Sequence, residues 1–268
     1  MAPVKESYDD KFFEPLMAIE DRHFWFRSRN QLIADLIQKY CTQYTNSTGN
    51  AKKGMEIGCG TGNVLKHVQS KFPGQMIVGV DLFYEGLRFA KSRGAAYLVQ
   101  ADIYQAPFSG GYDWIGLFDI IEHLDDDVAV LQQIRTLINA NGKLFISVPA
   151  FPVLWSYFDV AGKHKRRYTV QTLEMALQKA GLQLEFASYT NVMVFPLLWF
   201  LRRVLQGGEA PEALSEEELD CKTNSELRII PVVNEIIALI LGIEGKLIQW
   251  GLKMPFGTSL IAVAKPAS

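Results

Sequence analysis

The segment from Met55 to Leu65, Met-Glu-Ile-Gly-Cys-Gly-Thr-Gly-Asn-Val-Leu, constrains the fold more than any other part of the chain. A short apolar run enters a turn in which Gly58, Gly60 and Gly62 alternate, and an amphipathic pattern follows. Glycine tolerates positive φ and lets the backbone approach a ligand closely. The segment therefore predicts a buried strand, a ligand-binding turn and the start of a helix.

Short apolar runs and helical patterns alternate after this segment. The runs typical of strands lie at 53–57, 76–80, 96–99, 114–118, 144–148, 182–189 and 259–265. The helical patterns lie at about 62–71, 84–92, 126–139 and 169–180. This alternation predicts a parallel sheet covered on both faces. Roughly 65 residues of mostly helical pattern separate the last two strands, so they form an insertion in the final hairpin.

We therefore expect an α/β fold of one domain over 1–268, a doubly wound, Rossmann-like sheet of seven strands whose last strand is antiparallel. Its expected parts are a helical cap over 1–45, a cofactor-binding core over 46–190, a helical insertion or lid over 191–256 and the final strand over 257–268. Within this N-terminal segment, Ser28 is the expected N-cap residue of the second helix.

Composition excludes several classes of function. The 268 residues are 49% hydrophobic with a formal net charge of −2, which gives no overall attraction to nucleic acid. The cysteines Cys41, Cys59 and Cys221 are scattered, which indicates a reducing compartment and predicts no metal site. The first residues lack the apolar core of a signal peptide, so we expect a cytoplasmic protein.

The spacing of the glycines bears on which cofactor binds. A dinucleotide fingerprint needs a third glycine at position 63, where this chain has Asn63. The pattern instead resembles the first motif of the class I S-adenosylmethionine (SAM) methyltransferases, E/D-x-G-x-G-x-G, with Glu56 as its acidic residue. The run Phe118-Asp-Ile-Ile-Glu-His123-Leu resembles the fourth-strand motif of the same family, and 142–149 resembles its fifth strand.

The resemblance implies SAM as cofactor, S-adenosylhomocysteine as product, and a set of contacts at successive strand ends. An acidic residue after the second strand would accept hydrogen bonds from the ribose hydroxyls of SAM. An acidic residue after the third strand would accept one from the adenine amine, and the end of the fourth strand would face the methionine part. The implied cofactor residues are Glu56, Gly58, Cys59, Gly60, Gly62, Asp81, Leu82, Asp102, Ile103, Phe118 and Asp119. The residues alone leave simpler interpretations open, with Asp81 as a helix cap and Glu122-His123 as a surface turn.

The acceptor is expected at the run that follows the fifth strand. Its aromatic and basic side chains predict substrate contacts at Trp155, Tyr157, Arg166, Arg167 and Tyr168. His123 and His164 are the candidate general bases. A solvated basic loop is the alternative for 162–169.

Similar bacterial methyltransferases share a leader like His23-Phe-Trp-Phe-Arg-Ser-Arg-Asn30 and a run like His164-Lys-Arg-Arg-Tyr-Thr169. The leader side chains Trp25, Phe26 and Arg29 would then close over the cofactor. Simple packing of the aromatic cluster is the alternative.

The insertion holds two apolar runs, 192–201 and 229–242, both shorter than a membrane span. They fit a helical lid, a homodimer face, or a peripheral contact with the inner face of the membrane. We therefore expect methyl transfer from SAM to a small-molecule or lipid-linked acceptor, at oxygen. The alternatives are a SAM-binding or membrane-surface scaffold without catalysis and an NAD-dependent oxidoreductase. No nucleic-acid partner is expected, since Phe118-Asp119-Ile120-Ile121 stands where adenine methyltransferases carry a D-P-P-Y type motif.

Overall fold

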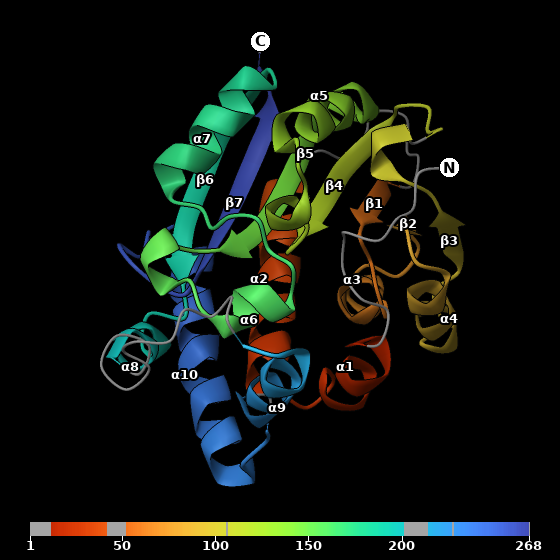
Figure 1. Ribbon diagram of the computed structural model, residues 1–268. Coiled ribbons are helices and arrows are strands. Elements are labelled where there is room, and N and C mark those ends of the chain that lie inside the picture. The colour runs from red at the N-terminus through yellow and green to blue at the C-terminus, as the bar shows by residue number, and fades with distance from the viewer. Residues whose placement is uncertain (1–11, 42–51, 106, 201–213, 227, 268) are drawn as a thin grey trace.

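A computed structural model describes residues 12–41, 52–105, 107–200, 214–226 and 228–267 (Figure 1). Its sheet has the strand order β3-β2-β1-β4-β5-β7-β6, and β7 runs antiparallel to both of its neighbours. The strands are β1 (Lys53–Ile57), β2 (Met76–Asp81), β3 (Tyr97–Gln100), β4 (Tyr112–Phe118), β5 (Ile138–Pro149), β6 (Leu182–Thr190) and β7 (Ser259–Pro266). The expected seven-stranded, Rossmann-like sheet with an antiparallel last strand is confirmed.

Helices cover both faces of the sheet. They are α1 (Phe13–Ile19), α2 (Phe24–Cys41), α3 (Asn63–Lys71), α4 (Tyr84–Ser92), α5 (Asp127–Leu137), α6 (Tyr157–Ala161), α7 (Val170–Lys179), α8 (Val194–Phe200), α9 (Glu216–Glu226) and α10 (Pro231–Gln249). Short 3-10 turns are η2 (Ile103–Gln105), η3 (Ile121–His123) and η4 (Pro152–Leu154). No helix among the described residues is long and apolar enough to cross a membrane.

The sheet divides the core into two layers because successive side chains of a strand point to opposite faces. On β4, Ile115 and Leu117 pack into the layer that holds α5 and α7. Trp114 and Phe118 pack into the opposite layer, with α2 and α3. Strands buried on both sides explain the near-continuous apolar runs in the sequence.

The leader and the insertion meet, although more than 200 residues separate them. Helix α10 packs along α2, where the Lys246 ammonium lies 2.7 Å from an Asp35 carboxylate oxygen. At the start of α2, the Phe24 amide donates to the Asn234 side-chain oxygen at 2.8 Å. The expected cap at Ser28 is therefore wrong, since the helix begins four residues earlier with a cap supplied by α10. The expected end of the N-terminal helical cap, at residue 45, lies outside the described residues.

Helices α1, α6, α8, α9 and α10 gather at the end of the sheet where β4 terminates, at the lower end in Figure 1. The carboxyl ends of parallel strands are where open α/β sheets bind ligands. The extra helices therefore stand over the edge at which a site is expected.

Candidate functional site

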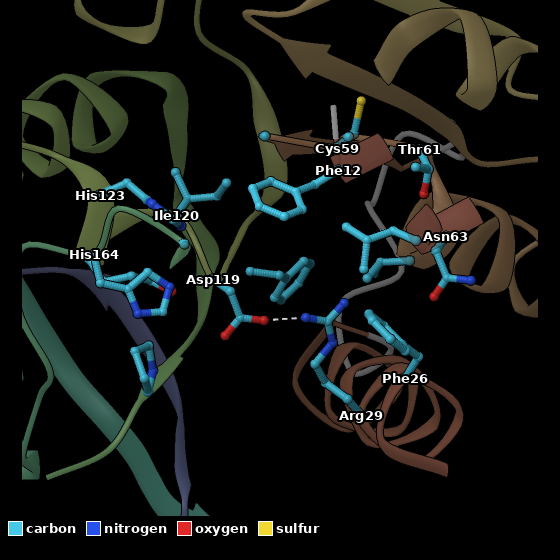
Figure 2. A pocket seen from close by; sticks show the side chains of 18 of the residues that line it. Phe12, Phe26, Arg29, Cys59, Thr61, Asn63, Asp119, Ile120, His123 and His164 are labelled. Atoms are coloured by element: carbon cyan, nitrogen blue, oxygen red, sulfur yellow. Dashed lines mark hydrogen bonds and ion pairs between the residues drawn. The ribbon is translucent and has the colours of Figure 1, made fainter. Parts of the chain in front are cut away.

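A cavity of about 970 Å³ lies at the carboxyl ends of β1, β2 and β4 (Figure 2). Its walls come from the glycine loop after β1, the segments after β2, β3 and β4, the leader, the run around His164 and helix α8. Ten of the expected cofactor residues line it: Glu56, Gly58, Cys59, Gly60, Asp81, Leu82, Asp102, Ile103, Phe118 and Asp119. Gly62 lies off the wall.

The glycine loop needs its glycines for two different reasons. The φ angles of Gly58, Gly60 and Gly62 are +73°, +49° and +75°, a region that side chains other than glycine rarely adopt. A Cβ on Gly58 would stand 2.0 Å from Ile120 Cδ1, and one on Gly62 would stand 2.8 Å from the Ala90 Cβ. Gly62 therefore lets α3 approach α4, whereas Gly60 faces the cavity.

Asp81 links the end of β2 to the glycine loop. One carboxylate oxygen accepts from the Gly60 amide at 2.7 Å and the other from the Phe83 amide at 2.8 Å. Burial raises the pKa of Asp81 in spite of these hydrogen bonds. Further along the same wall, Asp102 accepts from the Tyr104 amide at 2.9 Å. Both carboxylates thus hold the shape of the wall that they line.

Glu56 is fully buried at the end of β1, and its Oε2 has no hydrogen-bond partner among the described residues. Burial raises its pKa to about 8, although the charge of Arg29 acts in the opposite direction. Buried polar atoms in proteins are nearly always paired, so an unpaired carboxyl oxygen in a cavity wall indicates a missing ligand. Cys59, beside it, is buried and its pKa is well above the usual value because of that burial, which argues against a nucleophilic thiol.

The leader closes one side of the cavity, as Figure 2 shows. Arg29 donates to the Asp119 carboxylate and its guanidinium lies 4.4 Å from the centre of the Trp25 ring. Trp25, Phe26 and Arg29 all line the cavity, so the aromatic cluster does more than pack. Asn63 also joins the leader to the loop, since its side chain accepts from Asn30.

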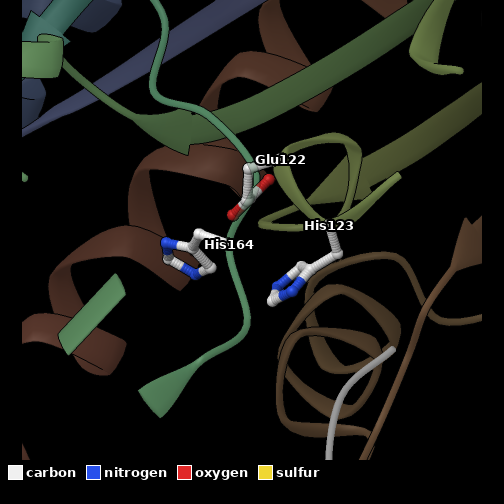
Figure 3. A group of neighbouring side chains, drawn as sticks. All are labelled: Glu122, His123 and His164. Atoms are coloured by element: carbon white, nitrogen blue, oxygen red, sulfur yellow. The ribbon is translucent and has the colours of Figure 1, made fainter. Parts of the chain in front are cut away.

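Three ionisable side chains form the far wall, and we call Glu122, His123 and His164 the polar corner (Figure 3). The two imidazole rings lie 4.7 Å apart at their centres and are nearly perpendicular. Burial, and then the nearby His164, lower the pKa of His123 to about 3, so its ring is neutral. Glu122 has no exposed surface, and neither of its carboxylate oxygens has a hydrogen-bond partner among the described residues.

His164 is held from behind by a buried carboxylate. Its Nδ1 lies 2.9 Å from Asp159 Oδ1, and Asp159 also accepts from Arg167 at 2.7 and 2.9 Å. Burial alone would raise the pKa of Asp159, but the His164 hydrogen bond and the Arg167 charge outweigh it and leave the pKa lowered. The ionised Asp159 therefore orients the imidazole, and Nε2 is the nitrogen left for chemistry.

Four of the five expected substrate residues, Trp155, Tyr157, Arg166 and Tyr168, lie off the cavity wall. Arg166 donates to the Leu124 and Asp125 carbonyls at 2.9 Å, and the Tyr168 hydroxyl donates to Asp127 at 2.6 Å. Trp155 and Tyr157 are also absent from the wall. Arg167 does line the cavity, but its guanidinium is bound to Asp159.

The sequence indicated no role for Asp159, and it placed Glu122 in the fourth-strand motif without a role of its own, with a surface turn as the alternative. The sole local signal for Asp159 was the spacing Ser156-x-x-Asp159, and this does form a capping box at the start of α6. That signal concerns the helix start and says nothing of His164.

Comparison with known proteins agrees with this geometry. A family model described as a methyltransferase domain matches residues 24–185, well over half of the chain. A ubiquinone biosynthesis O-methyltransferase of Escherichia coli is 27% identical over 103 residues, which cover 36% of this chain and 42% of that protein. The first curated relatives are matched over 42 to 64% of their own length.

Solved structures share the fold over nearly the whole chain. A putative sarcosine dimethylglycine methyltransferase from Galdieria sulphuraria matches with a TM-score of 0.62 and 14% identity, covering 96% of this chain and 98% of that one. The plantazolicin methyltransferase BpumL, solved with S-adenosylhomocysteine, matches with a TM-score of 0.56 and 14% identity, covering 90% and 86%.

The residues present fit SAM, which is a cation with a ribose and an adenine. The unpaired Glu56 oxygen offers a hydrogen-bonding group to a ligand, and Gly60 leaves backbone open to close approach. A pocket of this volume, mostly apolar with a few convergent polar groups, is typical of a site for a cofactor and a small acceptor. With its matching family domain and its strand order, the chain belongs to the class I SAM-dependent methyltransferases.

Proposed function

We propose that this methyltransferase transfers the methyl group of SAM to an oxygen atom of an apolar, small-molecule or lipid-linked acceptor. The observation that carries the proposal is the Asp159–His164 pair on the wall of a largely apolar cavity. A hydroxyl acceptor needs a group that removes its proton, whereas a preformed nucleophile does not.

The cofactor would lie along the glycine loop. Asp81 and Asp102, at the ends of β2 and β3, are the proposed partners of the ribose and the adenine, and Glu56 and the Arg29–Asp119 pair stand near the methionine part. When bound, SAM supplies an electrophilic methyl group, so the protein has chiefly to align the acceptor and exclude water.

The polar corner is the proposed acceptor end. His164 presents Nε2 because Asp159 binds Nδ1, and the arrangement is the one that orients a histidine base. His123 is the weaker candidate because a ring with a pKa of about 3 accepts a proton poorly at neutral pH. The similarity to a ubiquinone O-methyltransferase also favours oxygen as the methylated atom.

Helix α8 supports an apolar acceptor. Its Val194 and Leu198 line the cavity, while Leu197 and Phe200 on the helix and Met193 just before it are exposed. A second exposed stripe runs along α10, made of Val232, Ile236, Leu239 and Ile243. Exposed apolar surface of this extent is typical of a membrane or protein contact, and a lipid surface would deliver a lipid-linked acceptor beside the cavity.

The test is transfer of labelled methyl from SAM into fractionated lipids and small molecules of the source cell. We expect label in an alkali-stable ether of an apolar fraction, and a much slower single turnover in His164→Ala than in His123→Ala. Undiminished transfer in both variants would exclude a histidine base, and label confined to nitrogen compounds would exclude O-methylation. Sedimentation with and without vesicles separates a membrane contact from a homodimer face.

A further inference from the structure

The polar corner has the geometry of a metal site. Glu122, His123 and His164 each offer one ligand atom, and these three atoms lie within 4.8 Å of one another (Figure 3). Ligands at about 2.1 Å from a tetrahedral ion stand about 3.4 Å apart, so closing the site requires shifts of about 1 Å. The corner lines the cavity, which leaves room for a further ligand.

The state of Glu122 is an independent observation that points to a cation. Its side chain is fully buried, and neither carboxylate oxygen accepts a hydrogen bond within the described part of the chain. Burying a carboxylate without a partner is costly, and buried charges in proteins are paired or coordinate metals. The basic groups nearby are already engaged, since Arg29 binds Asp119 and Arg167 binds Asp159.

The groups behind His164 are arranged as they commonly are around a metal-bound histidine. Histidine ligands commonly donate their other ring N–H to a carboxylate, which fixes the ring orientation. His164 makes this contact with Asp159, whose second oxygen is held by Arg167. The Lys165 amide donates to the Glu122 carbonyl at 2.8 Å, and this bond ties the segment of His164 to the turn that carries the other two ligands.

We propose that Glu122, His123 and His164 bind one divalent transition-metal ion, such as Zn²⁺ or Mn²⁺, with a coordination position open to the acceptor. Two imidazole nitrogens and one carboxylate oxygen suit these ions, and a three-ligand set with an open position is typical of catalytic sites. The sequence predicted no metal site because its scattered cysteines show no ligand spacing, and His164 lies about 40 residues from the adjacent Glu122 and His123.

The role of the ion rests on the proposed function. A bound cation would lower the pKa of an acceptor hydroxyl, as it lowers that of bound water. His164 would then act as a ligand, and the hydroxyl proton would pass to solvent water, because the ion lowers the pKa of the hydroxyl far enough for water to accept it. The loss of transfer expected in His164→Ala would then come from loss of the ion. The acceptor class narrows to hydroxyl compounds that can reach the ion with their oxygen.

Metal binding can be measured without turnover. The full chain, stripped with a chelator and dialysed, is titrated with ZnCl₂ and MnCl₂ by calorimetry, and CoCl₂ gives a visible d–d spectrum. We expect one ion per chain, and at least a tenfold loss of affinity in Glu122→Gln and His164→Asn. Asp159→Asn should lose 10- to 100-fold. His67→Asn, on α3 outside the corner, should bind as the parent does.

Thermal unfolding and SAM affinity of the metal-free Glu122→Gln variant show whether it is folded, and His164→Asn provides a second test if it is not. Absence of stoichiometric binding, or equal affinity in both variants and the parent, would overturn the proposal. Full methyl transfer in the presence of the chelator would refute the ion's catalytic role and leave O-methylation intact. Stoichiometric binding that both variants lose would support the site even if no hydroxyl acceptor were methylated.

Discussion

The protonation of Glu56 gives a prediction about stability that can be worked out from the fold. Its pKa is raised to about 8 from the ordinary 4.5, chiefly by burial. Between these values the folded chain holds a proton that the unfolded chain releases, so stability falls as pH rises. The slope is about 1.4 kcal/mol per pH unit, which gives about 2 kcal/mol between pH 6 and 8. Above pH 8 the folded carboxyl also ionises and this contribution levels off.

Glu56→Gln removes the titration while keeping the size of the side chain. Other groups titrate in the same range, so the informative quantity is the difference in unfolding free energy between parent and variant, measured by urea denaturation from pH 6 to 8.5. We expect the variant to gain about 2 kcal/mol relative to the parent over pH 6 to 8. The exposed Glu217→Gln on α9 serves as control and should show no such gain. A difference curve for Glu56→Gln that is flat with pH would refute the reasoning.

Two further predictions concern the walls of the cavity. Gly58→Ala should lose affinity for SAM, because it combines a φ of +73° with a Cβ 2.0 Å from Ile120. The control Gly94→Ala has a φ of +94° but open space around its Cβ, so it should cost only about 1–2 kcal/mol of stability. Equal SAM affinity of the two variants, measured by calorimetry, would contradict this reasoning. Arg29→Met should weaken SAM binding about tenfold because it leaves Asp119 unpaired. Arg27→Met breaks only an exposed ion pair between the same helix and Glu235 of α10, so it should change the dissociation constant less than twofold.

The sheet could be predicted because its signals are local. Strand β1 was expected at 53–57 and spans Lys53–Ile57, and helix α7 begins after Thr169, where its helical pattern was expected to start. Each depends on an apolar run and a turn within about ten residues. The start of α2 could not be found this way, since the group that caps Phe24 is Asn234 on another helix.

The candidate site was predictable only where strands ended. The wall along the glycine loop follows from strand ends that a parallel sheet brings to one edge, and ten of the eleven residues expected to bind the cofactor line the cavity there. The wall around His164 comes from an irregular run, in which neighbouring side chains can point in opposite directions. Arg167 therefore faces the cavity while Arg166 turns to the Leu124 carbonyl, and no periodicity in the sequence distinguishes them.

The insertion supports the start of α2, the helix that carries Arg29. Asn234 on α10 accepts from the first amide of α2 and donates to the Arg22 carbonyl at 3.1 Å, so it fixes where that helix starts. Arg29 lies about one and a half turns further along the same helix, and its reach to Asp119 depends on that start. Loss of a helix cap costs about 1 kcal/mol. A substitution of Asn234 should therefore loosen the start of α2 and shift Arg29, although Asn234 itself does not line the cavity. The leader and the insertion are thus joined through α2 and α10, so they are best regarded as a single cover over the sheet.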